Sequence, residues 1–452
     1  MSNSTKNRHQ TGASIAECDG PRHVMPSGYA AGDGAAARGS SPYLDTYTKF
    51  AAKLPPDDRS FSARLERYRY QSAARKLLPD ERVSFCLRYI KPGSNHVLLM
   101  RSESRQSGRF SNLEVCGSVW VCPICSPHVA EHRRSDIARA ISVHRARGGA
   151  VYLVTRTVRH TSRDKLSDVL TPFRAAERRM TADGSYKRLL ASYGALGTIT
   201  ALEVTYGDES GWHPHTHTLL FLSAAAPDLG ALITGLYQRW EAAANAGNLT
   251  VTGKAFTVQP TYGAVDDYVA KWGRGPTKGI PWGVEDEMTK QHTKRGRARR
   301  RYAPFGLLGR YYYDHDEAAG ARFVEFASCF KGRSQLRWSP GLRAALVPDE
   351  QERSDLALAD TMPRDFEEWG MLDFEDWQAV DFANQRGELA NLVGAGDRAG
   401  VVELVKRCKS LHWLGVHAHA IRRDGGDAAT AVLPPAAVAG VSYNESEGLA
   451  WF

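Results

Sequence analysis

The clearest pattern of apolar and polar positions lies in the middle of the chain, where strand-like and helix-like segments alternate. Residues 150–160, AVYLVTRTVRH, are rich in β-branched residues and predict a β-strand. Residues 164–181 and 226–246 carry apolar residues at a spacing near 3.6, which predicts two amphipathic helices. Residues 195–206 and 212–222 predict two more strands, with the short turn GDESG between them.

The flanking regions differ from this middle part in composition. The first 55 residues are rich in Gly, Ala, Ser and Pro and show little periodicity, which predicts a disordered tail. A basic run, KQHTKRGRARRR, holds seven Lys or Arg at 290–301, whereas 349–381 holds twelve Asp or Glu against two Arg. The expected organisation is a tail at 1–55, a cysteine-rich module at 60–140, a core with a basic extension at 145–345 and an acidic, helical C-terminal region at 346–452.

Composition and charge narrow the class of protein. The 452 residues are 42% hydrophobic and 24% charged, which is ordinary for a globular protein. The formal net charge of +9 favours a polyanionic partner. The sequence has no apolar run of about eighteen residues and no apolar core of a secretory signal near its start. We therefore expect a cytoplasmic protein with no membrane partner. The seven clustered cysteines favour a reducing compartment with some thiols on a metal.

Three histidines alternate in the stretch GWHPHTHTLLFL. His213, His215 and His217 share one face if this stretch is a strand, because strand side chains alternate between faces. If residues 207–211 form the turn of a hairpin, Glu203 lies opposite His215 on that same face. Two imidazoles and a carboxylate with open positions left over are typical of a catalytic divalent-metal site. The alternative is an ordinary polar face in contact with solvent.

Four cysteines have a spacing typical of a structural zinc site. Cys116, Cys122 and Cys125 follow the pattern C-x5-C-x2-C, and Cys86 lies upstream. Four thiolates make a closed tetrahedral zinc site, which would be structural. His128 or His132 is an alternative ligand in place of one thiolate, and four free buried cysteines are the simpler alternative.

Several stretches resemble rolling-circle replication initiators of small bacterial plasmids, which are HUH endonucleases. EVTYGDESGWHPHTHTLLFL resembles their metal motif, YLVTRTVRH their first strand, and DDYVAKW their tyrosine motif. CGSVWVCPIC resembles an upstream cysteine cluster, and YAPFGLL and KGRSQLRWSPGLR resemble downstream segments. The motifs occur in the family's order over roughly residues 80–345. The resemblance implies an α+β fold: an HUH nuclease core with an antiparallel sheet flanked by helices, preceded by a zinc-binding module.

The resemblance also assigns the metal ligands. His215 and His217 match the HUH pair, with Thr216 as a less hydrophobic intervening residue than the family name suggests. Glu203 matches the third ligand of a divalent cation, Mg or Mn. His213 precedes the pair and is a candidate for orienting a ligand or contacting DNA.

The tyrosine motif suggests a nucleophile. Tyr268 and Lys271 lie three residues apart, so they share a face of a predicted helix. A nearby cation favours the phenolate of a group whose ordinary pKa is near 10. The alternative is that Tyr268 only packs in the helix, and the rival tyrosines are Tyr262 and the run 311–313. Where some relatives carry a Glu one turn before the nucleophile, this chain has Ala264, which leaves the terminating step open.

The resemblance implies a reaction and its partners. The tyrosine would nick single-stranded or hairpin origin DNA, leaving a 5′-phosphotyrosyl link and a free 3′-OH primer, and later rejoin the strand. A host helicase and a DNA polymerase would complete replication. Candidate phosphate contacts are the basic residues Arg295, Arg297, Arg299, Arg300 and Arg337. Alternatives are an HUH transposase or relaxase, or an inert zinc-containing DNA-binding regulator.

Overall fold

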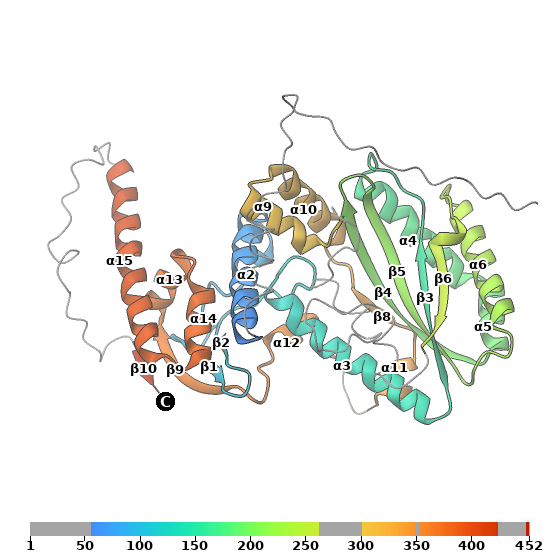
Figure 1. The fold of residues 1–452 in the computed structure, drawn as a ribbon, viewed down its shortest axis with the longest axis horizontal. Helices are drawn as coiled ribbons and strands as arrows, with labels where there is room; N and C mark the ends of the chain where they lie inside the picture. Colours follow the sequence, from blue (N-terminus) through green and yellow to red (C-terminus); the bar gives the residue numbers. More distant parts are fainter. Residues whose placement is uncertain (1–55, 262–300, 349–351, 424–448, 452) are drawn as a thin grey trace, which may run out of the picture.

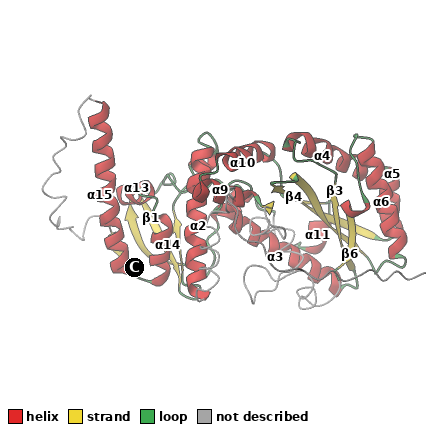
Figure 2. Ribbon diagram, turned by 45° about the horizontal axis from the view of Figure 1, so that its top comes forward, coloured by secondary structure: helices red, strands yellow, loops and turns green. Residues whose placement is uncertain are grey.

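The computed structural model describes residues 56–261, 301–348, 352–423 and 449–451. The predicted tail at 1–55 lies outside these residues. So do Tyr262, Ala264, Tyr268, Lys271, Arg295, Arg297, Arg299 and Arg300. The described chain is a mixed α+β structure with two antiparallel sheets flanked by helices, as Figures 1 and 2 show, which confirms the predicted fold class.

The larger sheet contains the strands predicted for the middle of the chain. Its strand order is β6-β3-β5-β4-β7, and β8 also pairs with β4. The long central strands β4 and β5 are consecutive in the chain and form a hairpin. The strands are β3 (Ala150–Thr157), β4 (Ala195–Gly207), β5 (Gly211–Leu222), β6 (Phe256–Pro260), β7 (Arg301–Tyr302) and β8 (Leu336–Trp338).

Helices cover both faces of this sheet, and the strands are accordingly apolar on both sides. In β5, Leu219 and Phe221 belong to one buried cluster while Leu220 and Leu222 belong to another, as alternation requires. The first cluster includes apolar residues of α3 (Cys125–Ala146) and α11 (Leu342–Leu346). The second includes those of α4 (Leu166–Ala182) and α6 (Leu229–Asn245), beside α5 (Gly184–Ser192). Figure 1 shows α4, α5 and α6 along the large sheet.

The smaller sheet joins the two ends of the described chain. Its order is β10-β9-β1-β2, so two strands from beyond residue 366 complete a sheet begun near residue 96. The strands are β1 (His96–Ser102), β2 (Ser107–Ser111), β9 (Glu367–Asp373) and β10 (Leu449–Trp451). The C-terminal region predicted to be helical therefore also contributes β-structure. The sequence of β9, EEWGMLD, is short and half exposed, so its apolar alternation is weak.

Helices from both ends surround the smaller sheet. They are α2 (Pro56–Leu77), α13 (Phe374–Phe382), α14 (Arg386–Ala395) and α15 (Arg398–Arg423). Close packing of α14 on β2 depends on two glycines. A Cβ at Gly108 would collide with the carbonyl oxygen of Ala390, and one at Gly394 would lie 2.6 Å from that of Gln106.

Two further helices connect the sheets. They are α9 (Pro304–Asp314) and α10 (Glu317–Phe330), which pack on each other, with α9 also against α2 and α10 against α4. Trp120 stacks edge-on against Phe330, with ring centroids 4.6 Å apart. Its indole Nε1 donates to the carbonyl oxygen of Arg333 over 2.7 Å. The remaining short elements are η1 (Arg82–Ser84), η2 (Gly253–Ala255) and α12 (Asp355–Asp360). The core around the smaller sheet is thus continuous with one face of the larger sheet.

Candidate metal centre and cysteine cluster

The β4–β5 hairpin has the register expected from its sequence. Glu203 pairs with His215, Tyr206 with Trp212 and Gly207 with Gly211, so the prediction of opposed Glu203 and His215 is confirmed. Gly211 has φ +73°, and a Cβ there would lie 2.6 Å from the carbonyl oxygen of Thr161. Glycine is therefore required at this turn, which fixes the register of the strand that follows.

Two imidazoles and one carboxylate converge on the α3 side of the sheet. The Oε2 atom of Glu203 lies 3.1 Å from Nε2 of His215 and 3.7 Å from Nε2 of His217. The Glu203 side chain is 1% exposed, and those of His215 and His217 are 13% and 9% exposed. The donor atoms all lie within 4.8 Å of one another. One carboxylate oxygen and two imidazole nitrogens at this separation suit a divalent cation with positions left open.

Hydrogen bonds on the far side of each ring orient the two histidines. Nδ1 of His215 lies 3.2 Å from the carbonyl oxygen of His213, and Nδ1 of His217 lies 2.9 Å from Oγ1 of Thr155. When Nδ1–H donates to these oxygens, each Nε2 directs its lone pair towards Glu203. The carbonyl oxygen beside His215 only accepts, so that contact is compatible with the tautomer that suits metal binding, and the Thr155 hydroxyl, which can accept or donate, allows the same tautomer at His217.

His213 lies on the same face but pairs with a histidine that the sequence analysis did not single out. Its Nδ1 is 2.7 Å from Nε2 of His160, whose Nδ1 is 2.9 Å from the carbonyl oxygen of Ser210. Burial, with the neighbouring His215 and His160, lowers the pKa of His213 to about 3. Within the described residues, the group able to share one metal contains Glu203, His215 and His217 and excludes His213.

Thr216, between the two histidines, faces the opposite side of the sheet. Its hydroxyl donates to Oε1 of Glu177 over 2.7 Å, and that buried carboxylate also pairs with Arg156 over 3.3 Å. Arg156 in turn donates to Oγ1 of Thr218 over 2.7 Å. A buried polar layer thus ties α4 to the back of the histidine strand. No local pattern predicts this contact, because Glu177 lies on a helix 39 residues away.

The four predicted cysteines come together in a buried cluster. The Sγ–Sγ distances are 3.6 Å for Cys86–Cys125, 3.7 Å for Cys116–Cys125 and 3.7 Å for Cys86–Cys122. These distances are far longer than a disulfide bond. A tetrahedron with Zn–S bonds of about 2.3 Å has edges of about 3.8 Å, so the thiol geometry fits a zinc ion. His128 is not part of this group, because its Nδ1 lies 3.2 Å from the Arg109 guanidinium.

Backbone and side-chain N–H groups point at the sulfurs. The amide of Ser118 donates to Cys116 over 3.5 Å and that of Cys125 donates to Cys122 over 3.4 Å. Although burial raises the pKa of Cys122, hydrogen bonds from Cys116, Cys125 and Cys86 lower that pKa well below its usual value. Hydrogen bonds within the cluster also raise the pKa values of Cys116 and Cys125 well above the usual value, so the cluster by itself favours a single thiolate, at Cys122.

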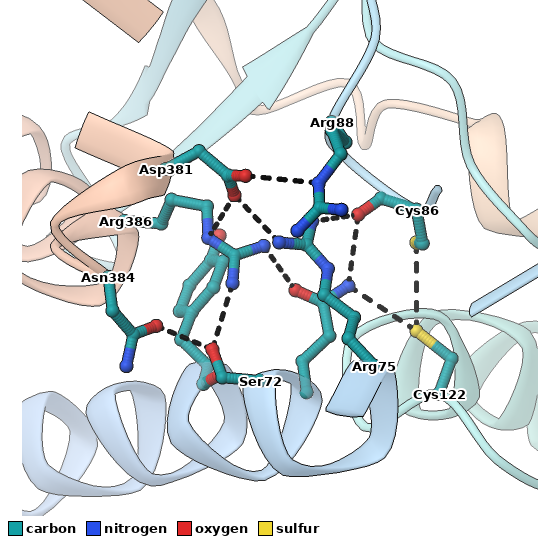
Figure 3. A network of polar contacts seen from close by, with 10 residues as sticks. Ser72, Arg75, Cys86, Arg88, Cys122, Asp381, Asn384 and Arg386 are labelled. Atoms are coloured by element: carbon teal, nitrogen blue, oxygen red, sulfur yellow. Dashed lines mark hydrogen bonds and ion pairs between the residues drawn. The ribbon is translucent and has the colours of Figure 1, made fainter. Parts of the chain in front are cut away.

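Cationic side chains surround the cluster on the side of the C-terminal helices (Figure 3). Gln71 donates from Nε2 to Cys122 Sγ over 3.7 Å, and Arg386 donates to Oε1 of Gln71 over 2.7 Å. Asp381 pairs with Arg75 over 2.7 Å, with Arg386 over 3.0 Å and with Arg88 over 3.3 Å. Three guanidinium groups and one carboxylate leave two net positive charges beside the thiols. Zinc with four thiolates carries two negative charges, so the two groups are electrostatically complementary.

The structure places the other predicted site residue away from the metal centre. Arg337 is opposite Thr200 on β4, so it lies on the sheet face opposite to Glu203. It lines a cavity of about 110 Å³ together with Arg174 and Arg333. Burial and Arg174 lower its pKa. A phosphate contact at Arg337 would therefore be separate from the Glu203 site. Of the rival tyrosines, Tyr311 is buried in α9.

Comparisons with known proteins match the part of the chain that holds most of the cysteine cluster and the Glu203 group. Residues 108–226 match a family model described as "Replication protein", a segment that includes three of the four clustered cysteines, Glu203 and the histidine pair. "Protein rep" of Streptomyces lividans is 27% identical over 312 residues, which cover 54% of this chain and 66% of the relative. "Neomycin resistance protein" of Streptomyces cyanogenus is 32% identical over 133 residues, which cover 24% of this chain and 30% of the relative.

The matched segments thus span just under two thirds of one relative and less than a third of the other. No solved structure gave a significant match. Among the helices of the described residues, none combines the length and the apolar character needed to cross a membrane.

Proposed function

We propose, from the match of residues 108–226 to the replication protein family model, that this chain is a plasmid replication initiator that nicks and rejoins origin DNA. The observation that supports the chemistry best is the convergence of Glu203, His215 and His217 on one buried face of the sheet. A structural metal site fills its coordination positions with protein ligands. A metal ion that polarises a phosphodiester needs an open coordination position for the phosphate oxygen.

In this proposal the chain's own residues position and activate the reacting groups. The two histidines and Glu203 would hold a divalent cation, Mg or Mn, which polarises the scissile phosphodiester of single-stranded or hairpin DNA. The phenolate oxygen of Tyr268 attacks the phosphorus in line, and the bond from phosphorus to the 3′-oxygen breaks. The 3′-oxygen leaves and takes up a proton, while the 5′-phosphate stays bonded to Tyr268. Lys271 favours the phenolate by its charge.

The products of this step suit replication. The free 3′-OH serves as a primer for a host DNA polymerase, with a host helicase opening the duplex ahead. Because the phosphotyrosyl link conserves the phosphodiester bond energy, a second transfer rejoins the strand without ATP.

The cysteine cluster would hold a structural zinc ion in the same proposal. Four thiol ligands leave no open position for water, so Cys86, Cys116, Cys122 and Cys125 would stabilise the fold and take no part in the nicking step. The three surrounding arginines and Gln71 would stabilise the negative charge of the thiolates.

An adduct assay tests the function directly. The purified chain is incubated with the single-stranded origin of its plasmid and Mg²⁺ or Mn²⁺, and the products are separated on a denaturing gel. We expect a covalent protein–DNA adduct with Tyr268 at the 5′ end, identified by peptide mass spectrometry. Tyr268→Phe should bind the DNA but form no adduct, because it keeps the ring and lacks the attacking oxygen.

A second set of experiments tests the metal ligands independently of the nucleophile. His215→Ala/His217→Ala should also form no adduct, and excess chelator should stop the wild-type reaction. Origin binding without any adduct in the wild-type chain would favour an inert DNA-binding regulator. An adduct on another tyrosine would leave the metal assignment in place and exclude Tyr268.

A further inference from the structure

A second cavity lies outside the metal centre, on the cysteine-cluster side of the molecule. It has a volume of about 370 Å³ and is bounded by α2, the β1–β2 hairpin and the first turns of α3. This volume is that of a pocket for a small ligand or one nucleotide. Its lining includes five arginines and two histidines, against a single acidic residue, Glu131: Arg64, Arg67, Arg105, Arg109, Arg134, His128 and His132.

The carboxylates near this pocket offset only part of its positive charge. Arg134 pairs with Glu131 over 2.7 Å, and Arg105 pairs with Asp365 over 2.7 Å. Arg109 contacts neutral groups, and the Asp365 carboxylate also acts on its charge. Arg109 donates to Nδ1 of His128 over 3.2 Å and lies over the ring of Phe366 at 4.8 Å. Five arginine charges against the charges of Glu131 and Asp365 leave the pocket with a net positive charge.

The arginines at the bottom of the pocket are held in place by the fold. Arg64 is 7% exposed, and its Nη1 donates to Oδ1 of Asn391 on α14 over 2.6 Å. Burial, followed by the charges of Arg67 and Arg105, lowers the pKa of Arg109 to about 10. Burial and Arg109 also lower the pKa of His128 well below its usual value. An anion in the pocket would offset this repulsion between like charges.

We propose that this pocket binds a backbone phosphate of DNA, at a place separate from the nicking centre. Guanidinium groups suit a phosphate because their planar N–H donors match its oxygens in pairs, and five of them open onto one cavity. A backbone phosphate can reach the pocket because Arg67 and Arg105 are exposed at its rim. The identification of this phosphate as part of DNA rests on the proposed function, whereas the affinity for phosphate follows from the lining of the pocket alone.

The test removes the two rim charges and compares them with two charges elsewhere. Arg67→Gln/Arg105→Gln alters exposed side chains, so the fold should persist. The matched control is Lys187→Gln/Arg188→Gln, which removes two exposed charges on α5, at the other end of the molecule in Figure 1. Circular dichroism and metal content check that both variants are folded.

Binding is measured by fluorescence anisotropy with a mixed-sequence labelled duplex at several salt concentrations. The slope of log K against log salt reports the phosphates neutralised on binding. In the rim variant, Arg67→Gln/Arg105→Gln, we expect the magnitude of this slope to fall by about 1 to 2. The control variant should keep the wild-type slope. Equal slopes in the rim variant and the wild type would overturn the proposal. If the rim variant is unfolded, Arg67→Gln/Arg134→Gln provides the same comparison.

Two further arms identify the source of the phosphate and separate this inference from the nicking function. If inorganic phosphate raises the melting temperature of the wild type and not of the rim variant, while DNA slopes are equal, the pocket binds a free phosphate and the DNA proposal is wrong. If the wild type forms no adduct with origin DNA but the slope difference is present, the nicking function fails and this inference stands.

Discussion

At the scale of single residues, Thr216 explains a departure from the expected motif. The position between His215 and His217 faces α4, where an apolar residue is the expected choice. Here the Thr216 hydroxyl donates to the buried carboxylate of Glu177, whose charge is balanced by Arg156 and Arg174. A hydroxyl at this position is therefore a consequence of the buried acid behind the strand.

Thr216→Val should destabilise the protein although the shapes of the two side chains are nearly the same. It removes a donor to a buried charged group, which costs about 1–3 kcal/mol. The midpoint of urea unfolding measures this loss. Thr257→Val on β6 is the control, because that threonine is exposed. Equal midpoints for the two variants would mean that the bond to Glu177 contributes little.

Glu203→Gln should weaken metal binding without changing the fold. The amide keeps the size of the side chain but loses the negative charge that a hard cation prefers. We expect the affinity for Mn²⁺, measured by calorimetry, to fall at least about tenfold. Glu209→Gln, an exposed residue in the hairpin turn, should leave it unchanged. Unchanged Mn²⁺ affinity in Glu203→Gln would exclude this carboxylate as a ligand.

At the scale of elements, the sequence predicted what a local pattern determines. The β4–β5 hairpin was predictable with its register, because a short turn and strict alternation fix which residues oppose each other. The helices at 164–181 and 226–246 correspond to α4 and α6. The cysteine cluster was predictable because three of its members lie within ten residues.

The elements that the sequence did not predict depend on distant partners. Thr155 and His160 take part in the site only because β3 is the neighbour of β5. Strand β9 is a strand because β1 offers it an edge, and its own residues alternate weakly. Arg386, which orients Gln71 beside Cys122, lies 315 residues from that glutamine. Contacts of this range leave no signal in a single sequence.

The cysteine cluster gives a prediction at this scale. Cys122→Ser/Cys125→Ser should lose about one zinc per chain by elemental analysis and become more sensitive to protease between α2 and α3, because a structural zinc supplies folding free energy. Cys329→Ser should keep the zinc, since Cys329 lies outside the cluster. A wild-type protein that folds without zinc would contradict the assignment.

At the scale of the whole molecule, one carboxylate links the two ends of the described chain. Asp381 on α13 pairs with Arg75 of α2 and Arg386 of α14, beside the carbonyl oxygen of Cys86. Although burial raises the pKa of Asp381, Arg386 and Arg75 lower that pKa below its usual value. The ion pairs of Asp381 therefore stabilise the fold at pH values above the unfolded-state pKa of about 4. This stabilisation is lost as the pH falls through the folded-state pKa.

Asp381→Asn should be far more costly than the loss of a surface pair. It leaves buried Arg386 without its counter-charge, at a cost of about 3–5 kcal/mol. Glu388→Gln breaks the exposed pair with Arg407 and should cost about 0–1 kcal/mol. Urea unfolding at neutral pH compares the two. The difference should shrink in acid, where Asp381 of the wild type becomes protonated. Similar costs at neutral pH would show that Asp381 is not the electrostatic link between the ends.

The pairing of β1 with β9 imposes an order on how the protein folds during translation. Leu98 meets Met371, so about 270 residues must be translated after the first strand before its partner exists. At 5–20 residues per second this delay is on the order of 15–50 s. The strands of the larger sheet lie closer together in the chain. The larger sheet can therefore form before β9 is synthesised, while one edge of β1 is still unpaired. A chain released early by a nonsense or frameshift mutation would carry that open edge permanently, and open edges invite aggregation and proteolysis. Truncated products should therefore be cleared even when the group of Glu203, His215 and His217 is complete.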